Sequence, residues 1–274
     1  MYLGLLHLLV ILLTFFAVTV TYPMFELSMS MALLLAVGVT GIVFLVLYVV
    51  FGRMDPAEVK QYRPCAGGWC ESKYHQCDLG LTKIPQQPVN TYSNLAFALG
   101  GALCFFWFRT PQSLTFMLLM IALCVGSALY HATSTRWGGQ LDVAGIYAVF
   151  TCLGVLAIFL FLKVGPILQA VAALGLGLFS GWLFRYKYKG DMQIKIAAML
   201  LVIYTFTIIG TSIWKEWKTS GWLLIGSLVS FAIAFLIWNL DKSCKFPLKR
   251  WGHGFWHMLA AVSCTLIFWA IGIL

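Results

Sequence analysis

Charged residues are scarce in this sequence, and that scarcity excludes a soluble globular protein. Only 10% of the 274 residues are charged, whereas 61% are hydrophobic. Ordinary soluble domains carry about 25% charged residues, and a soluble chain of this length could not hide so much apolar surface from water. The composition therefore predicts an all-α, polytopic membrane protein whose apolar helices cross the bilayer as a bundle.

Acidic residues are rarer still, and cysteines in metal-binding or redox spacing are missing. The chain has 9 Asp and Glu against 18 Lys and Arg, which gives a net charge of +9. The basic residues lie mostly in short loops between apolar runs, as they do on cytoplasmic flanks, so the charge does not indicate nucleic-acid binding. No CxxC pair occurs among the eight cysteines. Cys65, Cys70 and Cys77 share one loop with His75, but their irregular spacing gives little support to a zinc cluster there.

Long apolar runs dominate what remains. Nine of them are close to the ~20 residues that a bilayer-spanning helix needs. The first lacks the basic n-region and the small-residue cleavage site of a signal peptide, so we predict a helix there as well. Within the sixth run, Gly177 and Gly181 are spaced for close helix packing. The runs cover about residues 3–22, 30–51, 90–108, 113–131, 140–162, 164–184, 192–213, 220–240 and 253–273.

The distribution of Lys and Arg predicts the orientation in the membrane. Thirteen of them fall in the loops on the side of the N-terminus and four on the opposite side, with Lys195 inside a run and left out. Because basic residues are retained in the cytoplasm, the N-terminus is predicted to be cytoplasmic and the C-terminus to lie outside. The loops on the basic side span residues 52–89, 132–139, 185–191 and 241–252.

Five polar residues inside or beside the apolar runs are the candidate functional site. Ser127 and His131 end the fourth run, Asp142 begins the fifth, and His253 and His257 begin the ninth. The topology places all five on the same membrane face. Ionisable groups in membrane segments are costly and usually functional, so we expect these side chains to meet at one site.

The spacing of these residues is typical of a catalytic metal centre. His253 and His257 are four apart and share a helix face, so with His131 they can supply three imidazole ligands to zinc, whose fourth position holds water. Zinc makes that water a nucleophile near neutral pH. Asp142 is then available as general base and later acid, and Ser127 can donate a hydrogen bond to the developing oxyanion.

Less specific interpretations fit some of the same residues. A single histidine near a membrane surface is more often an interfacial residue than a ligand, and only the coincidence of both spaced pairs with Asp142 favours a metal site. Asn90 and Asn94 are interpreted as a polar network that fixes the preceding loop. Trp137, Trp251 and Trp256 are expected in the aromatic belt at the membrane interface.

Several short motifs, taken together, resemble those of the alkaline ceramidases, within a superfamily of seven-helix membrane hydrolases that includes adiponectin-receptor-like proteins. They occur in family order over about residues 69–274: WCE, NTYSN, SALYH, LD and HGFWH. The eleven-residue step from His131 to Asp142 fits the ceramidase branch better than the receptor branch.

The resemblance implies a function and a domain plan. It implies a zinc site made by His131, His253 and His257, with Ser127 and Asp142 beside it. The implied reaction is hydrolysis of the amide bond of a ceramide drawn from the bilayer, which yields a sphingoid base and a fatty acid. Residues 90–274 would form the seven-helix catalytic core, residues 58–89 a loop over the active-site face, and residues 1–57 a two-helix extension. An acyl-ester lipase and a receptor-like protein with a vestigial zinc site remain alternatives.

The same resemblance argues against calcium. Many animal alkaline ceramidases carry a calcium site written DWCExN with a later Glu, but this chain has Gly68 and Lys73 at the Asp and Asn positions and Gln87 near that of the later Glu. Calcium requires several oxygen ligands, and a lysine ammonium would repel it. We therefore predict zinc as the metal and no calcium dependence.

Cys70 and Cys244 leave a question open. Both belong to the predicted active-site face, and a disulfide between them could tie the loop to the last helix. Such a bond needs an oxidising compartment, whereas the Lys and Arg count places this face in the cytoplasm. Because the bias in Lys and Arg is large, we predict that the active-site face is cytoplasmic.

Overall fold

The structure is a computed structural model that describes residues 28–56, 59, 84–185, 192–213, 217–245, 247–248 and 251–272. Over these residues it consists of helices joined by short connections, with no strand. Eight of the nine predicted runs form helices, and the run at 3–22 lies outside the described residues. The helices are α2 (Met29–Arg53), α4 (Pro88–Ser93), α5 (Leu95–Phe108), α6 (Pro111–Thr133), α7 (Arg136–Phe161), α8 (Pro166–Phe184), α9 (Met192–Ile213), α10 (Trp217–Lys242) and α11 (Gly252–Gly272).

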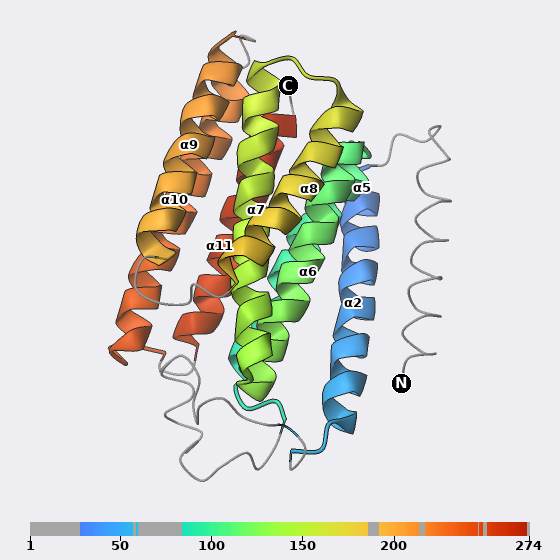
Figure 1. Cartoon of the computed structure of the whole chain (residues 1–274), viewed down its shortest axis with the longest axis vertical. Coiled ribbons are helices and arrows are strands. Elements are labelled where there is room, and N and C mark those ends of the chain that lie inside the picture. Colours follow the sequence, from blue (N-terminus) through green and yellow to red (C-terminus); the bar gives the residue numbers. More distant parts are fainter. Residues whose placement is uncertain are drawn as a thin grey trace.

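Seven helical segments are long and apolar enough to cross a membrane, which confirms the polytopic all-α class. In addition, α9 carries a shorter apolar stretch at Met199–Ile209. The helices run side by side along one axis, with α9 and α10 at one edge of the bundle and α2 toward the other (Figure 1). The seven spans are α2, the continuous segment Pro88–Phe108, α6, α7, α8, Ser220–Lys242 and α11.

The predicted glycine contact in α8 is confirmed. A Cβ atom on Gly181 would lie 2.6 Å from the carbonyl oxygen of Ala144, and one on Gly177 would lie 3.0 Å from that of Ala148. Both partners belong to α7. Because small residues let helix backbones approach closely where lipid provides no hydrophobic driving force, this pair of glycines seats α8 against α7.

Helix α2 packs against the core rather than standing apart from it. Its small and β-branched residues, spaced three or four apart, form one buried stripe that meets α5 and α6. The spacing is that of one helix face. The contact joins Ala32, Ala36 and Val39 of α2 with Ala102, Phe105, Phe106 and Met117.

The connection between α6 and α7 is shorter than the predicted loop at 132–139. Ser134 adopts a left-handed conformation (φ 52°), and its N–H donates to the carbonyl of Tyr130 at 2.7 Å, which ends α6. The Thr135 hydroxyl then accepts from the N–H of Gly138 at 3.2 Å and caps α7. This cap was not anticipated, and it starts α7 four residues early. Asp142 therefore lies in the second turn of α7 and not at its first residue.

The helix predicted at 90–108 begins at Pro88 and is interrupted at Asn94. Proline is well suited to a first helical position because it lacks the N–H that would be unsatisfied there. The Asn94 side chain donates to the carbonyl oxygen of Asn90 at 2.7 Å, where a backbone N–H would bond in a regular helix. The chain thus forms the short helix α4 before α5 continues.

Candidate metal centre

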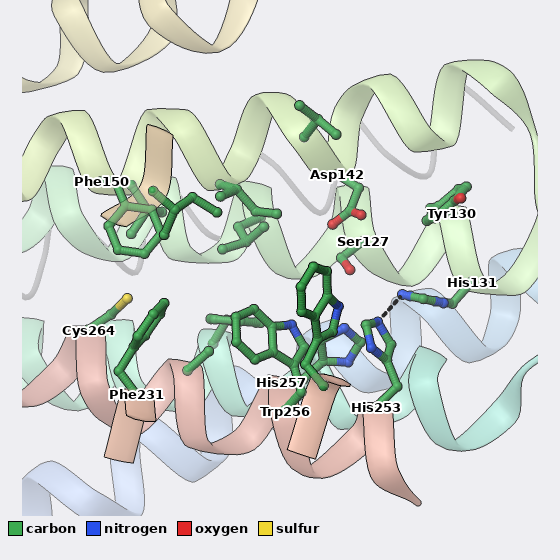
Figure 2. Close-up of a pocket in the computed structure, with 18 residues that line it drawn as sticks. Ser127, Tyr130, His131, Asp142, Phe150, Phe231, His253, Trp256, His257 and Cys264 are labelled. Atoms are coloured by element: carbon green, nitrogen blue, oxygen red, sulfur yellow. Dashed lines mark hydrogen bonds between the residues drawn. The ribbon is translucent and has the colours of Figure 1, made fainter. Parts of the chain in front are cut away.

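Three histidine side chains converge where α6 ends and α11 begins (Figure 2). His131 comes from the last turn of α6, and His253 and His257 come from the first two turns of α11. Each is at most 4% exposed. The ring centroids are 4.9 Å apart for His131 and His253, 5.1 Å for His131 and His257, and 4.4 Å for His253 and His257. One ring nitrogen from each lies within 4.8 Å of the others, so one metal ion can be shared.

Gln87 sets the orientation of the His131 ring. Its side-chain oxygen accepts a hydrogen bond from Asn90 at 2.9 Å and lies 2.8 Å from Nδ1 of His131. Because an amide oxygen only accepts, the hydrogen of the neutral imidazole is on Nδ1 and a lone pair is on Nε2. Fixing the second nitrogen in this way is typical of histidines that bind metals.

Ser93 has the same role toward His257. Its hydroxyl donates to the carbonyl oxygen of Asn90 at 3.1 Å and lies 2.8 Å from Nδ1 of His257. The single hydroxyl hydrogen is used on Asn90, so the serine oxygen accepts from Nδ1–H. His257 therefore also presents the lone pair of Nε2.

The arrangement of the ring nitrogens fits a bound zinc ion. Nε2 of His131 and Nε2 of His253 are 3.3 Å apart, and the hydrogen bond to Gln87 leaves a lone pair on the first of these atoms. These two nitrogens are hydrogen-bonded to each other, and a metal ion that took the place of the shared hydrogen would bind both of them. Three neutral imidazoles without a thiolate are a ligand set that catalytic zinc uses, with one coordination position left for water.

Two glycines that flank His253 let α11 approach its neighbours closely. A Cβ atom on Gly252 would lie 2.9 Å from Cγ of Asp241 in α10, and one on Gly254 would lie 2.9 Å from a methyl carbon of Val89 in α4. A larger residue at either position would force the facing side chain or α11 itself to shift. Residues 252–257 thus combine two metal-ligand candidates with the two glycines that let the start of α11 approach α10 and α4.

The segment before α4 is docked on the end of α6. The backbone N–H groups of Gln86 and Gln87 donate to the carbonyls of Ala132 and His131 at 3.0 and 3.2 Å, which are among those that a helix end leaves without intrahelical partners. The Ser134 hydroxyl also donates to the Gln86 side chain. These bonds hold Gln87 at the His131 ring.

Close packing of α6 on α7 brings Ser127 and Asp142 together. A Cβ atom on Gly126 would lie 2.9 Å from the carbonyl of Leu141, and one on Gly145 would lie 2.8 Å from Cα of Leu123. This contact brings the Ser127 hydroxyl beside the Asp142 carboxyl group, and both side chains line the same pocket. Figure 2 shows the pair facing the three histidines across a pocket.

The pocket is polar at one end and apolar along the rest. It has a volume of about 80 Å³ and is lined by all five candidate site residues. In Figure 2 the histidines, Ser127 and Asp142 lie toward one end, and Phe150, Phe231 and Cys264 toward the other. A reactive end joined to an apolar channel suits a molecule with a polar linkage next to a hydrocarbon chain.

Comparison with known protein families agrees with this geometry. The family model described as Ceramidase matches residues 61–274, most of the chain and all of the site. The chain belongs to the ceramidase family. This confirms the family that the motifs indicated and supports a membrane enzyme that hydrolyses ceramide. Searches of curated proteins and of solved structures found no match.

Several residues in the site of this ceramidase-family protein were missed by sequence reasoning. Gln87 was considered only as a lost calcium ligand, whereas it is fully buried and contacts His131. Ser93 was not singled out at all. Trp256, expected in the interfacial belt, lines the pocket beside Trp238. A serine or glutamine that ends up beside a histidine from a distant segment leaves no local signal, although the network expected at Asn90 is confirmed by its bond to Gln87.

Other sequence expectations lie partly or wholly outside the described residues. Gly68, Cys70 and Lys73 are outside them, so the absence of calcium dependence stays a prediction. Cys244 is disulfide-bonded, and its partner cysteine is not among the described residues.

Proposed function

We propose that this protein is a zinc-dependent amidohydrolase that cleaves ceramide-like lipids into a sphingoid base and a fatty acid. The observation that carries the proposal is the buried group of three histidines, two of which have Nδ1 held by Gln87 and Ser93, so that their other ring nitrogens are turned toward the remaining rings. Purely structural histidines have no need of three rings converging in a pocket that also contains a serine and a carboxylate.

Zinc is the metal that this ligand set favours. His131, His253 and His257 would hold it through imidazole nitrogens, without the all-oxygen cage that calcium or magnesium prefers. When bound, zinc supplies a Lewis acid that polarises the substrate carbonyl and promotes loss of a proton from water. The side chains of the protein would orient the substrate, transfer the proton and stabilise the oxyanion.

The pocket orients the substrate by its polarity. The apolar part, with Phe150, Phe231 and Cys264, would receive hydrocarbon from the lipid. The amide linkage would then lie at the polar end, between the histidines and the pair Ser127 and Asp142. Holding the reacting groups in this geometry contributes to the rate by removing the entropy cost of bringing them together.

Asp142 would carry the proton during hydrolysis. As a carboxylate it takes one proton from the attacking water while the water oxygen bonds to the amide carbon. As a carboxylic acid it gives that proton to the amide nitrogen, the carbon–nitrogen bond breaks, and amine and fatty acid result. Asp142 returns to its starting form, so the cycle balances.

Ser127 would change its hydrogen bond as Asp142 changes its charge. With Asp142 ionised, Ser127 would donate its single hydroxyl hydrogen to the carboxylate beside it. Once Asp142 is protonated, its own O–H can donate to Ser127, and the serine hydrogen is released toward the carbonyl oxygen, where negative charge has formed. Ser127 would thus stabilise the oxyanion only after proton transfer.

Metal analysis combined with lipid-product analysis tests the proposal. We expect purified wild type to contain one zinc per chain and to release free amine and fatty acid from ceramide in mass spectrometry. Release of acid only from ester lipids would assign the ester-lipase alternative. A protein without stoichiometric zinc and without turnover would be receptor-like, and the proposal would be wrong.

We propose that the end of the bundle that contains the histidine site faces the cytoplasm. The reason is that most Lys and Arg residues fall in the loops predicted on that side of the membrane. The disulfide at Cys244 is the observation against it, because cytoplasmic thiols are kept reduced. In intact cells, a membrane-impermeant maleimide should label a cysteine introduced as Lys163→Cys at the opposite end but not one introduced as Lys245→Cys. Labelling of Lys245→Cys alone would reverse the orientation.

A further inference from the structure

Beyond the residues that line the pocket, we infer that Asp241 of α10 is a positioning residue for the metal site, acting through the start of α11. The inference rests on the proposed role of the histidines as metal ligands. Asp241 is a carboxylate that is only 1% exposed, although it lies near the end of a membrane helix where water is close. Burying a charge in this way is costly and calls for a specific function.

The backbone around Asp241 is held rigidly. Cys244 adopts a left-handed conformation (φ 54°), its N–H donates to the carbonyl of Asp241 at 2.9 Å, and the N–H of Lys245 donates to that of Leu240 at 2.9 Å. These two bonds form a Schellman motif, which closes the C-terminus of a helix. The Asp241 side chain therefore projects from a fixed point.

That side chain meets α11 at the residue before a metal ligand. Cγ of Asp241 would be 2.9 Å from a Cβ atom on Gly252, so the carboxylate lies directly against the backbone there. Gly252 begins α11 and His253 follows it. The first turn of a helix carries the positive end of the helix dipole, which a nearby carboxylate stabilises.

On the opposite side of His253, Gly254 is packed against Val89 of α4. The start of α11 is therefore held between α10 and α4. A shift away from Asp241 would move His253 relative to His131, whose Nε2 atom lies 3.3 Å from that of His253. Metal ligation is sensitive to such shifts, and loss of a residue that orients a ligand typically costs about 10- to 100-fold in metal affinity.

Zinc affinity of the full-length protein in detergent, measured by competition with a chelator, tests the inference. We expect Asp241→Ala to weaken zinc binding about 10- to 100-fold, with a thermal unfolding temperature of the metal-free protein close to that of wild type. Asp241→Asn should recover part of the loss, because its amide oxygen can still face Gly252 without the charge. Asn239→Ala is the matched control, since this exposed side chain bonds only within its own helix.

Gly252→Ala approaches the same contact from the other side. It should also weaken zinc binding, and the double variant with Asp241→Ala should lose less than the two single losses combined, because truncating Asp241 removes most of the obstruction. If Asp241→Ala fails to fold, Asp241→Asn and Gly252→Ala decide the question.

Three results would count against these ideas in different ways. Unchanged zinc affinity in the folded Asp241 and Gly252 variants would overturn the role of Asp241 while leaving the proposed function intact. A lower unfolding temperature of the metal-free Asp241→Ala protein with wild-type zinc affinity would assign Asp241 to general stability. Absence of zinc binding in wild type would overturn the proposed function and this inference together.

Discussion

Two clusters of buried polar side chains lie among the apolar helices, and they differ in where their hydrogen bonds point. One is the histidine site. The other joins α9, α10 and α11 through Tyr204, Ser227 and Ser263, where the Tyr204 hydroxyl lies 2.8 Å from that of Ser227 and the Ser227 hydroxyl lies 2.8 Å from that of Ser263. The hydroxyls of this second cluster bond to one another.

The histidine site has the opposite arrangement. Gln87 and Ser93 bond the outer nitrogens of His131 and His257, so the inner nitrogens face a common point in the pocket. Both clusters are polar and lie among apolar helices, yet only the histidine site turns its ring nitrogens toward a pocket. Polarity inside a membrane is thus not enough to indicate a catalytic site. The direction of the lone pairs makes the distinction.

The largest effect on zinc content and turnover is expected when a metal ligand is removed. His131→Ala and His253→Ala are each expected to lose bound zinc and to reduce ceramide hydrolysis at least about 10³-fold, because the charge stabilisation that the metal supplies is worth several kcal/mol. Elemental analysis and quantitative product detection measure the two effects. A ligand variant that lacks zinc and keeps wild-type turnover would show that the metal is not part of the reaction.

A substitution at Asp142 tests proton transfer separately from metal binding. Asp142→Asn keeps the shape of the side chain but cannot take up a proton from water, so the rate constant kcat should fall about 10²- to 10⁴-fold. Zinc content should stay at the wild-type level. Near-normal kcat in this variant would remove Asp142 from the mechanism.

Gln87 tests whether the outer hydrogen bonds matter. Gln87→Ala should weaken zinc affinity about 10- to 100-fold because His131 loses the partner that fixes its ring. Gln87→Glu serves as the control, since a carboxylate still accepts from Nδ1 and should retain zinc. Equal zinc affinity in wild type and Gln87→Ala, measured by chelator competition, would show that Gln87 only holds the preceding loop in place.

The smallest effect is expected in the second cluster. Ser227→Ala removes one interhelical hydrogen bond, and such bonds in membrane proteins are worth about 0.6 kcal/mol on average. Thermal unfolding should change slightly, while zinc content and turnover stay at wild-type values. A large loss of turnover without a loss of stability would show that this cluster also contributes to the active site.

Much of the fold and part of the site could be predicted without coordinates. Apolar runs of bilayer length predicted eight described helices to within a few residues at most ends. The spacing of His253 and His257, with a topology that brings Ser127, His131 and Asp142 to the same face, selected five residues that the structure places around one pocket. The start of α7 was wrong because the Thr135 cap was not recognised in a polar stretch.

The sequence by itself determined the membrane class, the helices and the identity of the candidate ligands, because hydropathy and i, i+4 spacing are local properties of the chain. Only the tertiary structure decided which groups orient those ligands. His131 meets Gln87 across 44 residues of sequence, and His257 meets Ser93 across 164. The first contact depends on the docking of residues 86–87 on the end of α6, and the second on the close approach of α11 to α4 at Gly254. No periodicity within a single helix contains that information.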